Sequence, residues 1–325
     1  MILLDADVLG RNRTGEETYV LNLLRQLPTA APDLRFAAVT RHPELVPDGV
    51  EAVPLATGSQ ELRMAWTLPR LLRRLRPELL HTQHARPLGW AGKSVVTLHD
   101  LHFERHPETM GLVDRLTFKA VVPRAAKRAD AVLAVSERTK ADAVELYGIP
   151  PAKITVTPHG VDPAFAPGDG APGGYALFVG AVQARKDPLA ALAQARAAGL
   201  RLIVAGPEKE PELARRLRDG GAELRGWVEK AELAELYRGA VAVLLPSRYE
   251  GFGIPALEAM ASGTPVVVSD DPALREVVGD AAAPSLEAAA AERERFRQAG
   301  LARAKLFTWE EAARRTVEVY RRVLA

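Results

Sequence analysis

The chain has 325 residues, of which 47% are hydrophobic and 26% charged, so we expect two globular domains and exclude a disordered or fibrous protein. Lys and Arg number 43 against 41 Asp and Glu, and the net charge of +2 argues against nucleic acid as a partner. Cysteine is absent, which excludes disulfides, thiolate zinc sites and cysteine nucleophiles. The N-terminus lacks a signal-peptide pattern, and no apolar run reaches about 18 residues, so we expect a cytoplasmic protein that does not span a membrane.

The first half of the chain alternates short apolar runs with stretches of helical period, which is typical of a parallel sheet covered by helices on both faces. The strands expected there are residues 2–4, 35–40, 79–81, 94–98 and 131–135. The helices expected there are residues 16–26, 61–75, 112–128 and a helix that Ser136 caps and that ends near Gly148.

A linker is predicted over residues 157–175, which are rich in Pro, Gly and Asp and have no period. Beyond it the alternation restarts, with strands expected at residues 175–182, 201–205, near 224, 241–245 and 265–269. The helices expected between them are residues 188–197, 212–218, 231–237 and one from about residue 254. The tail, residues 307–325, predicts an amphipathic helix capped by Thr308. We therefore expect two doubly wound domains, residues 1–165 and 166–306, and a final helix over 307–325.

The segment PSRYEGFGIPALEAMASGTPVVVSD, residues 246–270, predicts a buried strand, a glycine-containing loop and a helix with Pro255 in its first turn. Gly251 and Gly253 let a ligand approach the main chain, and the free N–H groups of a helix start suit hydroxyl and phosphate oxygens. Glu250 and Glu258 add two acceptors beside that loop. An ordinary strand-to-helix turn with surface glutamates is the alternative for so short a glycine motif taken alone.

A second motif is FVGAVQARKDPLAAL, residues 178–192, where a strand is followed by Asp187 as helix cap and Pro188 as first helical residue. Arg185 and Lys186 then lie at the carboxyl end of the strand, where doubly wound sheets bind ligands. Two adjacent cations there would neutralise a pyrophosphate and stabilise a leaving nucleoside diphosphate. The alternative is a solvated Arg-Lys pair.

In the first half, His99 and Asp100 directly follow the strand 94–98, again at a carboxyl end. A helix-cap or core histidine is the alternative for His99. Four more histidines are close in sequence, yet they lack the regular pairing with acidic residues that a metal site needs, so no metal site is predicted. They are His81, His84, His102 and His106.

The two glycine- and cation-containing motifs together closely resemble glycosyltransferase family 4, and the resemblance extends over almost the whole chain. It implies the α/β GT-B fold: two facing Rossmann-like domains, a deep interdomain cleft, and a C-terminal helix that crosses back to the N-terminal domain. It also implies that the C-terminal domain holds a nucleotide-sugar donor and the N-terminal domain the acceptor. The catalytic residues that it implies are His99, Arg185, Lys186 and Glu250. The donor-binding residues that it implies are Gly15, Gly180, Arg185, Lys186, Trp227, Val228, Glu250, Gly251, Phe252, Gly253, Ile254 and Glu258.

Within this resemblance Glu250 lies near the donor sugar, Gly251 to Gly253 contact sugar and phosphate through the backbone, and Glu258 holds the ribose hydroxyls. Trp227 and Val228 line the nucleotide base, although a buried core tryptophan is an equal alternative. The loop over residues 11–19 departs from the family. Its Gly15 matches, but Glu17 stands where many members have a second glycine, and a carboxylate beside phosphate repels it, so we expect Glu17 to point elsewhere.

The predicted helix over residues 61–75 combines apolar residues with a series of arginines. A basic amphipathic helix lies on the inner, anionic surface of a membrane, or else it turns its apolar face to the core and its arginines to water. Both interpretations stay open. The arginines concerned are Arg63, Arg70, Arg73, Arg74 and Arg76.

The function expected from the resemblance is retaining transfer of a mannose- or glucose-type hexose to a hydroxyl acceptor, without a metal or other cofactor. GDP-mannose is the first expectation for the donor and a UDP- or ADP-hexose the second, while a glycan, glycolipid or small metabolite is the acceptor. The alternatives are a catalytically silent nucleotide-sugar-binding protein and a nucleotide-sugar epimerase of similar architecture. A dinucleotide-dependent oxidoreductase would need Gly-x-Gly-x-x-Gly after the first strand, which residues 11–19 lack.

Overall fold

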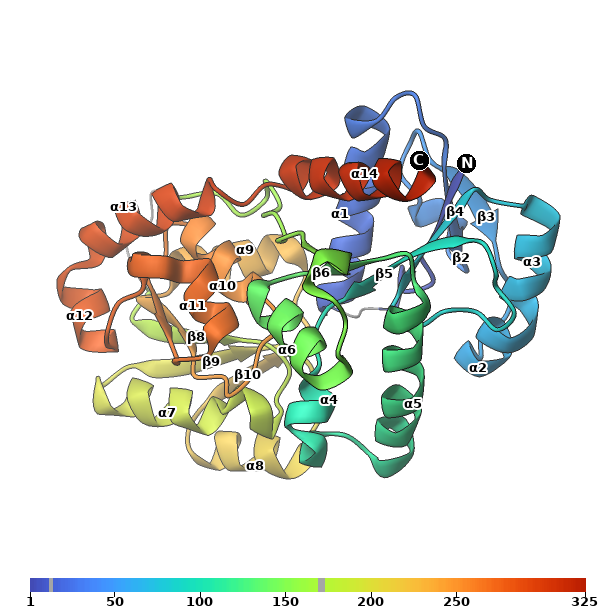
Figure 1. The fold of residues 1–325 in the computed structure, drawn as a ribbon. Helices are drawn as coiled ribbons and strands as arrows, with labels where there is room; N and C mark the ends of the chain where they lie inside the picture. Colours follow the sequence, from blue (N-terminus) through green and yellow to red (C-terminus); the bar gives the residue numbers. More distant parts are fainter. Residues whose placement is uncertain (12–13, 169–172) are drawn as a thin grey trace. The chain divides into compact units, whose positions relative to one another are not determined.

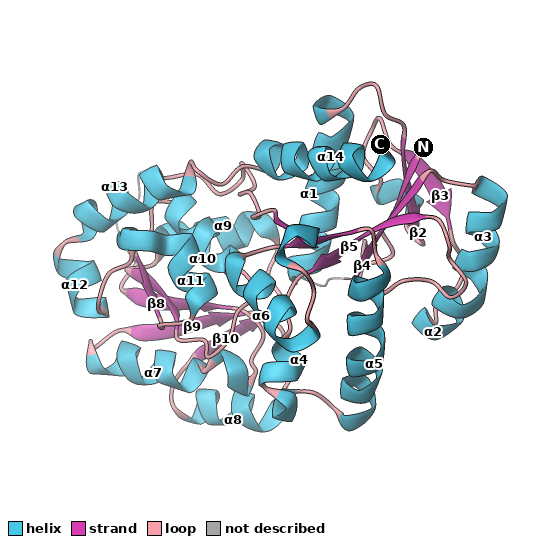
Figure 2. Ribbon diagram, in the orientation of Figure 1, coloured by secondary structure: helices cyan, strands magenta, loops and turns pink. Residues whose placement is uncertain are grey.

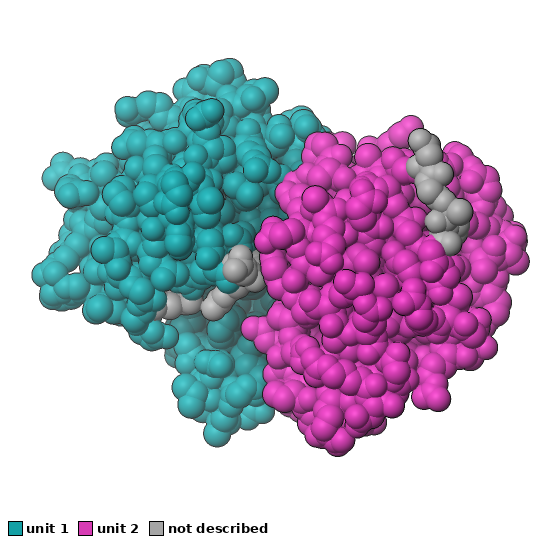
Figure 3. All heavy atoms as spheres, turned by 180° about the vertical axis from the view of Figure 1, so that it is seen from behind, with its two compact units in different colours: residues 1–105, 110–160, 309–325 teal, residues 106–109, 161–308 magenta. Residues whose placement is uncertain are grey.

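The computed structural model describes residues 1–11, 14–168 and 173–325. The described chain forms two compact units (Figure 3). Unit 1 comprises Met1–Arg105, Met110–Gly160 and Trp309–Ala325, and unit 2 comprises His106–Thr109 and Val161–Thr308. Residues 12–13 of the expected phosphate loop and residues 169–172 of the expected linker lie outside the described residues. Within the described ranges, no helix is both long and apolar enough to cross a bilayer.

Unit 1 contains a parallel sheet in the order β3-β2-β1-β4-β5-β6-β7 (Figure 1). Its inner strands are buried along their length because helices cover both faces, which is why they are nearly continuous apolar runs. The strands are β1 (Ile2–Asp5), β2 (Phe36–Thr40), β3 (Glu51–Pro54), β4 (Leu79–Gln83), β5 (Lys93–Leu98), β6 (Ala131–Ala134) and β7 (Ile154–Val156).

The helices of unit 1 (Figure 2) are α1 (Thr14–Ala30), α2 (Gln60–Leu62), α3 (Leu68–Leu75), α4 (His102–Arg105), α5 (Leu112–Arg128), α6 (Glu137–Tyr147) and α14 (Trp309–Leu324). The predicted cap of α6 is confirmed, since Ser136 accepts a hydrogen bond from the Thr139 N–H and the helix ends at Gly148 with φ 63°. The C-terminal helix α14 shares one apolar core with α1 and β1, through Trp309 and Tyr320 among others. The expected return of the final helix to the N-terminal unit is thereby confirmed.

Unit 2 contains a parallel sheet in the order β10-β9-β8-β11-β12. Its strands are β8 (Tyr175–Val179), β9 (Arg201–Ala205), β10 (Glu223–Gly226), β11 (Ala242–Leu245) and β12 (Val266–Val268). Its helices are α7 (Pro188–Ala197), α8 (Pro211–Asp219), α9 (Lys230–Gly239), α10 (Ile254–Ala261), α11 (Pro272–Val278), α12 (Leu286–Ala291) and α13 (Arg293–Ala304). In both units the order reverses next to the first strand, and ligands of doubly wound sheets bind outside the carboxyl ends of the strands at such a reversal.

Two expectations for the first half are wrong. The sequence does not predict β3 or β7, because both are short outer strands with exposed or half-buried polar residues. The continuous helix expected over residues 61–75 is broken into α2, a π-helical turn (Arg63–Thr67) and α3. Pro69 has no N–H to donate to the carbonyl of Ala65, so the regular ladder of hydrogen bonds is interrupted there.

Arg63 is turned inward, which contradicts an all-exposed basic face for that helix. Its guanidinium group pairs with the buried carboxylates of Asp5 and Asp7 at the end of β1. The other arginines of the series, from Arg70 onward, remain exposed. Neither interpretation foresaw this: Arg63 belongs to the interior, and the arginines from Arg70 onward face solvent.

Candidate active site

The carboxyl ends of β8 and β11 carry most of the residues predicted for the donor. Gly180 follows β8 with φ 147°, and a Cβ atom placed on it would lie 3.8 Å from Lys186 Cε. Arg185 and Lys186 occupy one turn of 3₁₀ helix (Ala184–Lys186), which ends at Asp187, and the side chain of Asp187 caps α7 as predicted. The Arg248 N–H donates to the Arg185 carbonyl at 2.8 Å, so the loops after β8 and β11 are joined.

Lys186 and Glu250 form the centre of this cluster. Lys186 Nζ lies 2.6 Å from Glu250 Oε2, and the Ser247 hydroxyl donates to Glu250 Oε1 at 2.7 Å. Arg185 Nη1 is 3.9 Å from Glu250 Oε2. The side chains of Arg185, Lys186 and Glu250 are only 14%, 12% and 8% exposed, so neither a solvated cation pair nor a surface glutamate describes them.

The charges of this cluster stabilise one another. Burial by itself would raise the pKa of Glu250, but the charges of Lys186 and Arg185 and the hydrogen bonds of Lys186 and Ser247 hold it below its ordinary value. Glu250 is therefore an ionised acceptor that is already fixed in position. A carboxylate held in this way orients hydroxyl groups well and is a poor nucleophile.

The loop 250–253 leads from this cluster into α10. Gly253 adopts φ 112° and is the N-terminal cap residue, with Pro255 in the first turn as predicted. Phe252, by contrast, is buried and meets Phe307 edge-on at 5.9 Å, so a ligand would meet its backbone. Ile254, the first helical residue, is partly buried. The positive dipole end of α10 thus begins three residues after Glu250 in the chain.

Glu258 lies one turn further along α10. The Tyr237 hydroxyl of α9 donates to Glu258 Oε2 at 2.8 Å. Burial, with some contribution from Asp162, raises the pKa of Glu258 to about 8. Sequence reasoning missed Tyr237, whose place in a helical apolar pattern is that of a core residue, and Ser247, which lies inside the predicted motif but was given no role.

Trp227 follows β10 and is 47% exposed, so the alternative of a buried core tryptophan is wrong. Gly226 before it has φ 64°, which turns the chain at the carboxyl end of the sheet. Val228 follows in the same loop and is partly buried. An exposed indole beside a strand end provides a flat apolar face for a ring such as a nucleotide base.

His99 of unit 1 lies at the end of β5 inside a buried group of rings. Its Nε2 is 2.8 Å from Gln83 Oε1, and its ring lies 4.9 Å from that of Tyr19 and 5.3 Å from that of His84. Burial lowers the pKa of His99 to about 4, so the ring is neutral, and the amide oxygen of Gln83 assigns its proton to Nε2. His99 is therefore buried in the core, and it also lies at the carboxyl end of β5.

The neighbouring His84 carries a different charge. Its Nε2 lies 3.2 Å from Glu16 Oε1. Burial favours the neutral form of both groups, but their hydrogen bond and mutual attraction lower the pKa of Glu16 to about 2 and raise that of His84. His84 also adopts φ 57°, which is uncommon for a residue with a side chain and costs backbone free energy.

Gly15 lies in the first turn of α1, two residues before Glu17. Glu17 Oε1 accepts a hydrogen bond from the Gly10 N–H at 2.7 Å, so this carboxylate is engaged with the backbone of the loop before α1. Among the described residues, no group of three or more His, Asp or Glu side chains is arranged to hold a metal ion.

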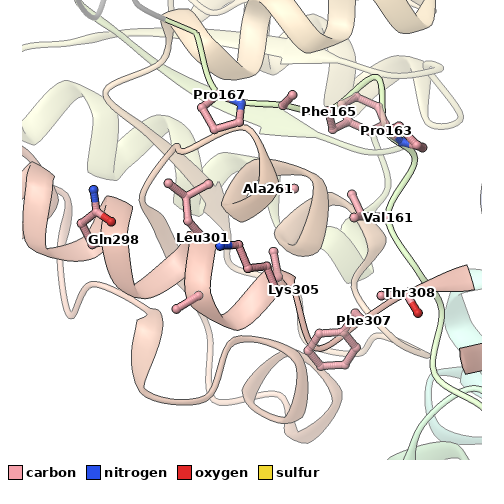
Figure 4. Close-up of a pocket in the computed structure, with 13 residues that line it drawn as sticks. Val161, Pro163, Phe165, Pro167, Ala261, Gln298, Leu301, Lys305, Phe307 and Thr308 are labelled. Atoms are coloured by element: carbon pink, nitrogen blue, oxygen red, sulfur yellow. The ribbon is translucent and has the colours of Figure 1, made fainter.

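A separate cavity of about 520 Å³ lies in unit 2 between residues 161–167 and α13 (Figure 4). Its lining is largely apolar and includes Phe165, Leu301 and Phe307, together with Lys305. None of the residues predicted for the site lines it. The cavity is therefore separate from the predicted site residues at the strand ends.

Two family models match the chain. The model described as Glycosyltransferase Family 4 matches residues 13–165, and the model described as Glycosyl transferases group 1 matches residues 174–300. O-antigen chain mannosyltransferase B of Escherichia coli is 29% identical, over 70% of this chain and 70% of the relative. D-inositol 3-phosphate glycosyltransferase of Kineococcus radiotolerans is 33% identical over 60% of this chain, which spans only 58% of that relative.

Solved structures are similar along the whole chain. Sucrose-phosphate synthase of Thermosynechococcus elongatus gives a TM-score of 0.75 at 20% identity, covering 99% of this chain and 98% of the other. HepE of Anabaena, in complex with UDP and glucose, gives a TM-score of 0.71 at 15% identity and covers 98% of both chains. At these identities the likeness concerns the fold, and it confirms the expected GT-B class with its two parallel-sheet α/β domains.

Proposed function

This chain belongs to glycosyltransferase family 4, and we propose that it is a retaining enzyme that transfers a hexose from a nucleotide sugar to a hydroxyl group. The observation that carries the proposal is the Lys186–Glu250 cluster, where two cations and one ionised carboxylate lie together after β8 and β11, with the start of α10 following in the same loop. Phosphate needs cations and backbone N–H groups, and a sugar needs fixed hydrogen-bond acceptors. This cluster offers both.

The donor is proposed to lie along the strand ends of unit 2. Its diphosphate would contact Arg185, Lys186 and the first turn of α10, with Gly180 and Gly251 allowing the main chain to come close. Glu258 would receive the ribose hydroxyls. The exposed face of Trp227, next to Val228, would take the base.

The proposed reaction needs no covalent intermediate on the protein. The bond between the anomeric carbon and the phosphate oxygen breaks, the acceptor oxygen attacks from the same face, and its proton passes to the leaving phosphate. Arg185 and Lys186 would stabilise the charge that develops on this phosphate, and Glu250 would orient the sugar. Because Glu250 is ion-paired and hydrogen-bonded at both oxygens, it is disfavoured as a nucleophile.

GDP-mannose is the proposed donor, with a UDP-hexose as second candidate. The name of the Escherichia coli relative supports mannose, and the complex of HepE with UDP and glucose supports the second candidate. We propose that the cations of the protein neutralise the diphosphate without a metal ion or other cofactor. The metal-independence is tested by measuring turnover in the presence of a chelator, which should leave the rate unchanged.

The protein is proposed to act in the cytoplasm, and the acceptor is proposed to bind at the strand ends of unit 1. There His84 Nδ1 and Gln83 Nε2 are buried and have no hydrogen-bond partner among the described residues. Burying such groups costs free energy unless a ligand or water completes the bonds. A hydroxyl group of a glycan, glycolipid or small metabolite would satisfy both of them.

The first experiment is a thermal-shift panel of GDP-mannose, UDP-glucose, UDP-GlcNAc, ADP-glucose, the free nucleoside diphosphates and NAD. A ligand that binds only the native state raises the melting temperature, so a shift with one nucleoside diphosphate and its sugar identifies the donor. NMR of the product with that donor then gives the anomeric configuration, which we expect to be retained. A shift with NAD alone, or with none of the compounds, contradicts the proposal, whereas binding without turnover favours a silent sugar-nucleotide-binding protein.

A further inference from the structure

Large apolar side chains that are exposed lie mostly in unit 1, as judged over the described residues. Several of them follow the strands β3, β4 and β5, whose carboxyl ends form one edge of the sheet because the strands are parallel. Large apolar side chains left exposed after several strands on one edge of a sheet point to an interaction site. We call the following residues the apolar rim: Leu62, Trp66, Leu88, Leu112, Val113 and Leu116.

Helix α5 contributes half of the apolar rim. Leu112, Val113 and Leu116 are 61%, 76% and 58% exposed in its first two turns. The opposite side of α5 is already packed, since Val122 and Ala125 are buried and Phe118 meets Phe103 edge-on at 5.4 Å. The three exposed residues therefore take no part in the packing on the buried side of α5.

The second half of α5 is basic. Arg124, Lys127 and Arg128 are exposed, and Asp114 is the one acidic residue in the helix. Lys153 Nζ donates to the Lys127 carbonyl at 2.7 Å and adds a fourth cation at this end. The exposed side of α5 therefore passes from apolar to cationic along its length.

The segment from α2 to α3 repeats the same arrangement. Leu62 and Trp66 are about half exposed at its start, and the arginines follow in α3. The Arg70 guanidinium stacks 3.6 Å from the centre of the Trp66 ring. The segment from α2 to α3 and helix α5 both belong to unit 1, and in each the exposed apolar residues come first and the exposed basic residues follow.

We propose that this edge of unit 1 docks on a bilayer that contains anionic lipid. The apolar rim would enter the boundary between headgroups and acyl chains, and the arginines and lysines of α3 and α5 would contact lipid phosphates. Charge complementarity favours a bilayer as the occupant, because both exposed helix faces combine apolar starts with cationic ends. If the proposed function holds, this surface also identifies the acceptor class as a lipid-linked hydroxyl compound presented at the membrane surface.

The test is co-sedimentation of the full chain with vesicles of phosphatidylcholine alone or mixed with phosphatidylglycerol. We expect binding to the mixed vesicles that weakens as salt is added, and little binding to phosphatidylcholine alone. The double variant Leu112→Glu, Leu116→Glu should lose at least ten-fold in vesicle binding. Its matched control is Leu306→Glu, since Leu306 is 66% exposed in unit 2, and it should bind as the wild type does.

A second pair of variants tests the charges. Replacing Arg124, Lys127 and Arg128 by Gln should lower the affinity for anionic vesicles by about five-fold for each charge. Replacing three exposed arginines of α8 in unit 2 by Gln should leave it unchanged. Those control residues are Arg215, Arg216 and Arg218.

Three outcomes would overturn the inference. They are no binding of the wild type to anionic vesicles, equal loss in the Leu306→Glu control, and a wild-type dimer in sedimentation velocity that the α5 variant dissociates, which would make a second copy the occupant. Thermal shifts with nucleoside diphosphates are measured on the same variants and should be unchanged. If those shifts are absent while vesicle binding holds, the proposed function fails and the docking surface does not.

Discussion

The two sheets have their strands in the same order, but the carboxyl ends of those strands carry different kinds of side chain. In unit 2 they carry ionised groups, Arg185, Lys186 and Glu250, that hold one another in place near the protein surface. In unit 1 they carry a buried group of rings around His99, most of it neutral. The difference is one of charge: the edge of unit 2 holds fixed ions, which the proposed diphosphate would require, and the edge of unit 1 holds mainly neutral rings.

The comparison predicts that charge in unit 2 matters most. Lys186→Ala and Glu250→Gln should each lower kcat/KM by about 100- to 1,000-fold, because each removes a fixed electrostatic contact from a site largely shielded from water. The measurement is release of nucleoside diphosphate from the donor that the thermal-shift panel identifies. Arg248→Ala is the matched control, since Arg248 is a neighbouring cation that pairs only weakly with Asp187, at 3.3 Å. If the control loses as much activity as Lys186→Ala, the special role of the cluster is refuted.

The next effect concerns the glycines that bring the strand ends of unit 2 together. A Cβ atom on Gly206 would lie 2.1 Å from the Gly180 carbonyl oxygen, with φ 149°, so Gly206→Ala should cost about 3 kcal/mol or more of folding free energy. Gly180→Ala has room at 3.8 Å and should mainly weaken donor binding through its strained φ of 147°. Urea unfolding of both variants checks this order, and equal unfolding midpoints would contradict it.

The donor edge is our name for the carboxyl ends of β8 and β11, where the donor is proposed to bind. Its local structure could be predicted from the sequence because its residues lie in two short stretches, 178–192 and 246–270, each a strand, a turn and a helix start. Local rules for caps and glycines are sufficient there, as the Asp187 cap and the Gly253 turn illustrate. The strand order within each unit, and Tyr237 beside Glu258, depend on contacts between distant segments, which local rules do not describe.

The carboxyl ends of the unit 1 strands, where the acceptor is proposed to bind, were predicted much less well, because their residues also come together through contacts between distant segments. Its ring group joins Tyr19, His84 and His99 with His159 and Trp309, which come from five separate parts of the chain. Only His99 stood out, because it follows a strand directly. Arg63 was placed wrongly because its partner Asp5 lies 58 residues earlier in the sequence, and no periodic pattern reports such a pair.

One charged pair in unit 1 sharpens the contrast with its neutral surroundings. The lowered pKa of Glu16 stabilises the folded protein above pH 4.5, and this stabilisation is lost as the pH falls toward the folded pKa of about 2. The raised pKa of His84 stabilises the folded protein below pH 6.5, and this stabilisation is lost as the pH rises through the raised pKa. His84→Asn, which tolerates the positive φ, should therefore destabilise the protein by about 2 kcal/mol, most strongly between about pH 4.5 and 6.5. Urea unfolding at several pH values checks this, with His42→Asn on the exposed His42–Glu44 pair as control. A loss that does not vary with pH would contradict the ion pair.

The smallest effect concerns Glu258, whose pKa is raised by burial, in contrast to the lowered pKa of Glu250. Its pKa of about 8 lies above the ordinary 4.5, so the folded state keeps a proton that the unfolded state has lost, and stability falls as the pH rises from about 4.5 to 8. Glu258→Gln removes this slope and should stabilise the protein by about 1–2 kcal/mol near pH 8, with little change near pH 5. The melting temperatures of both proteins across this range are the measurement, and Glu232→Gln on the exposed side of α9 is the control. Parallel curves for Glu258→Gln and the wild type would mean that Glu258 is ionised like Glu250, and the donor edge would then be uniformly charged.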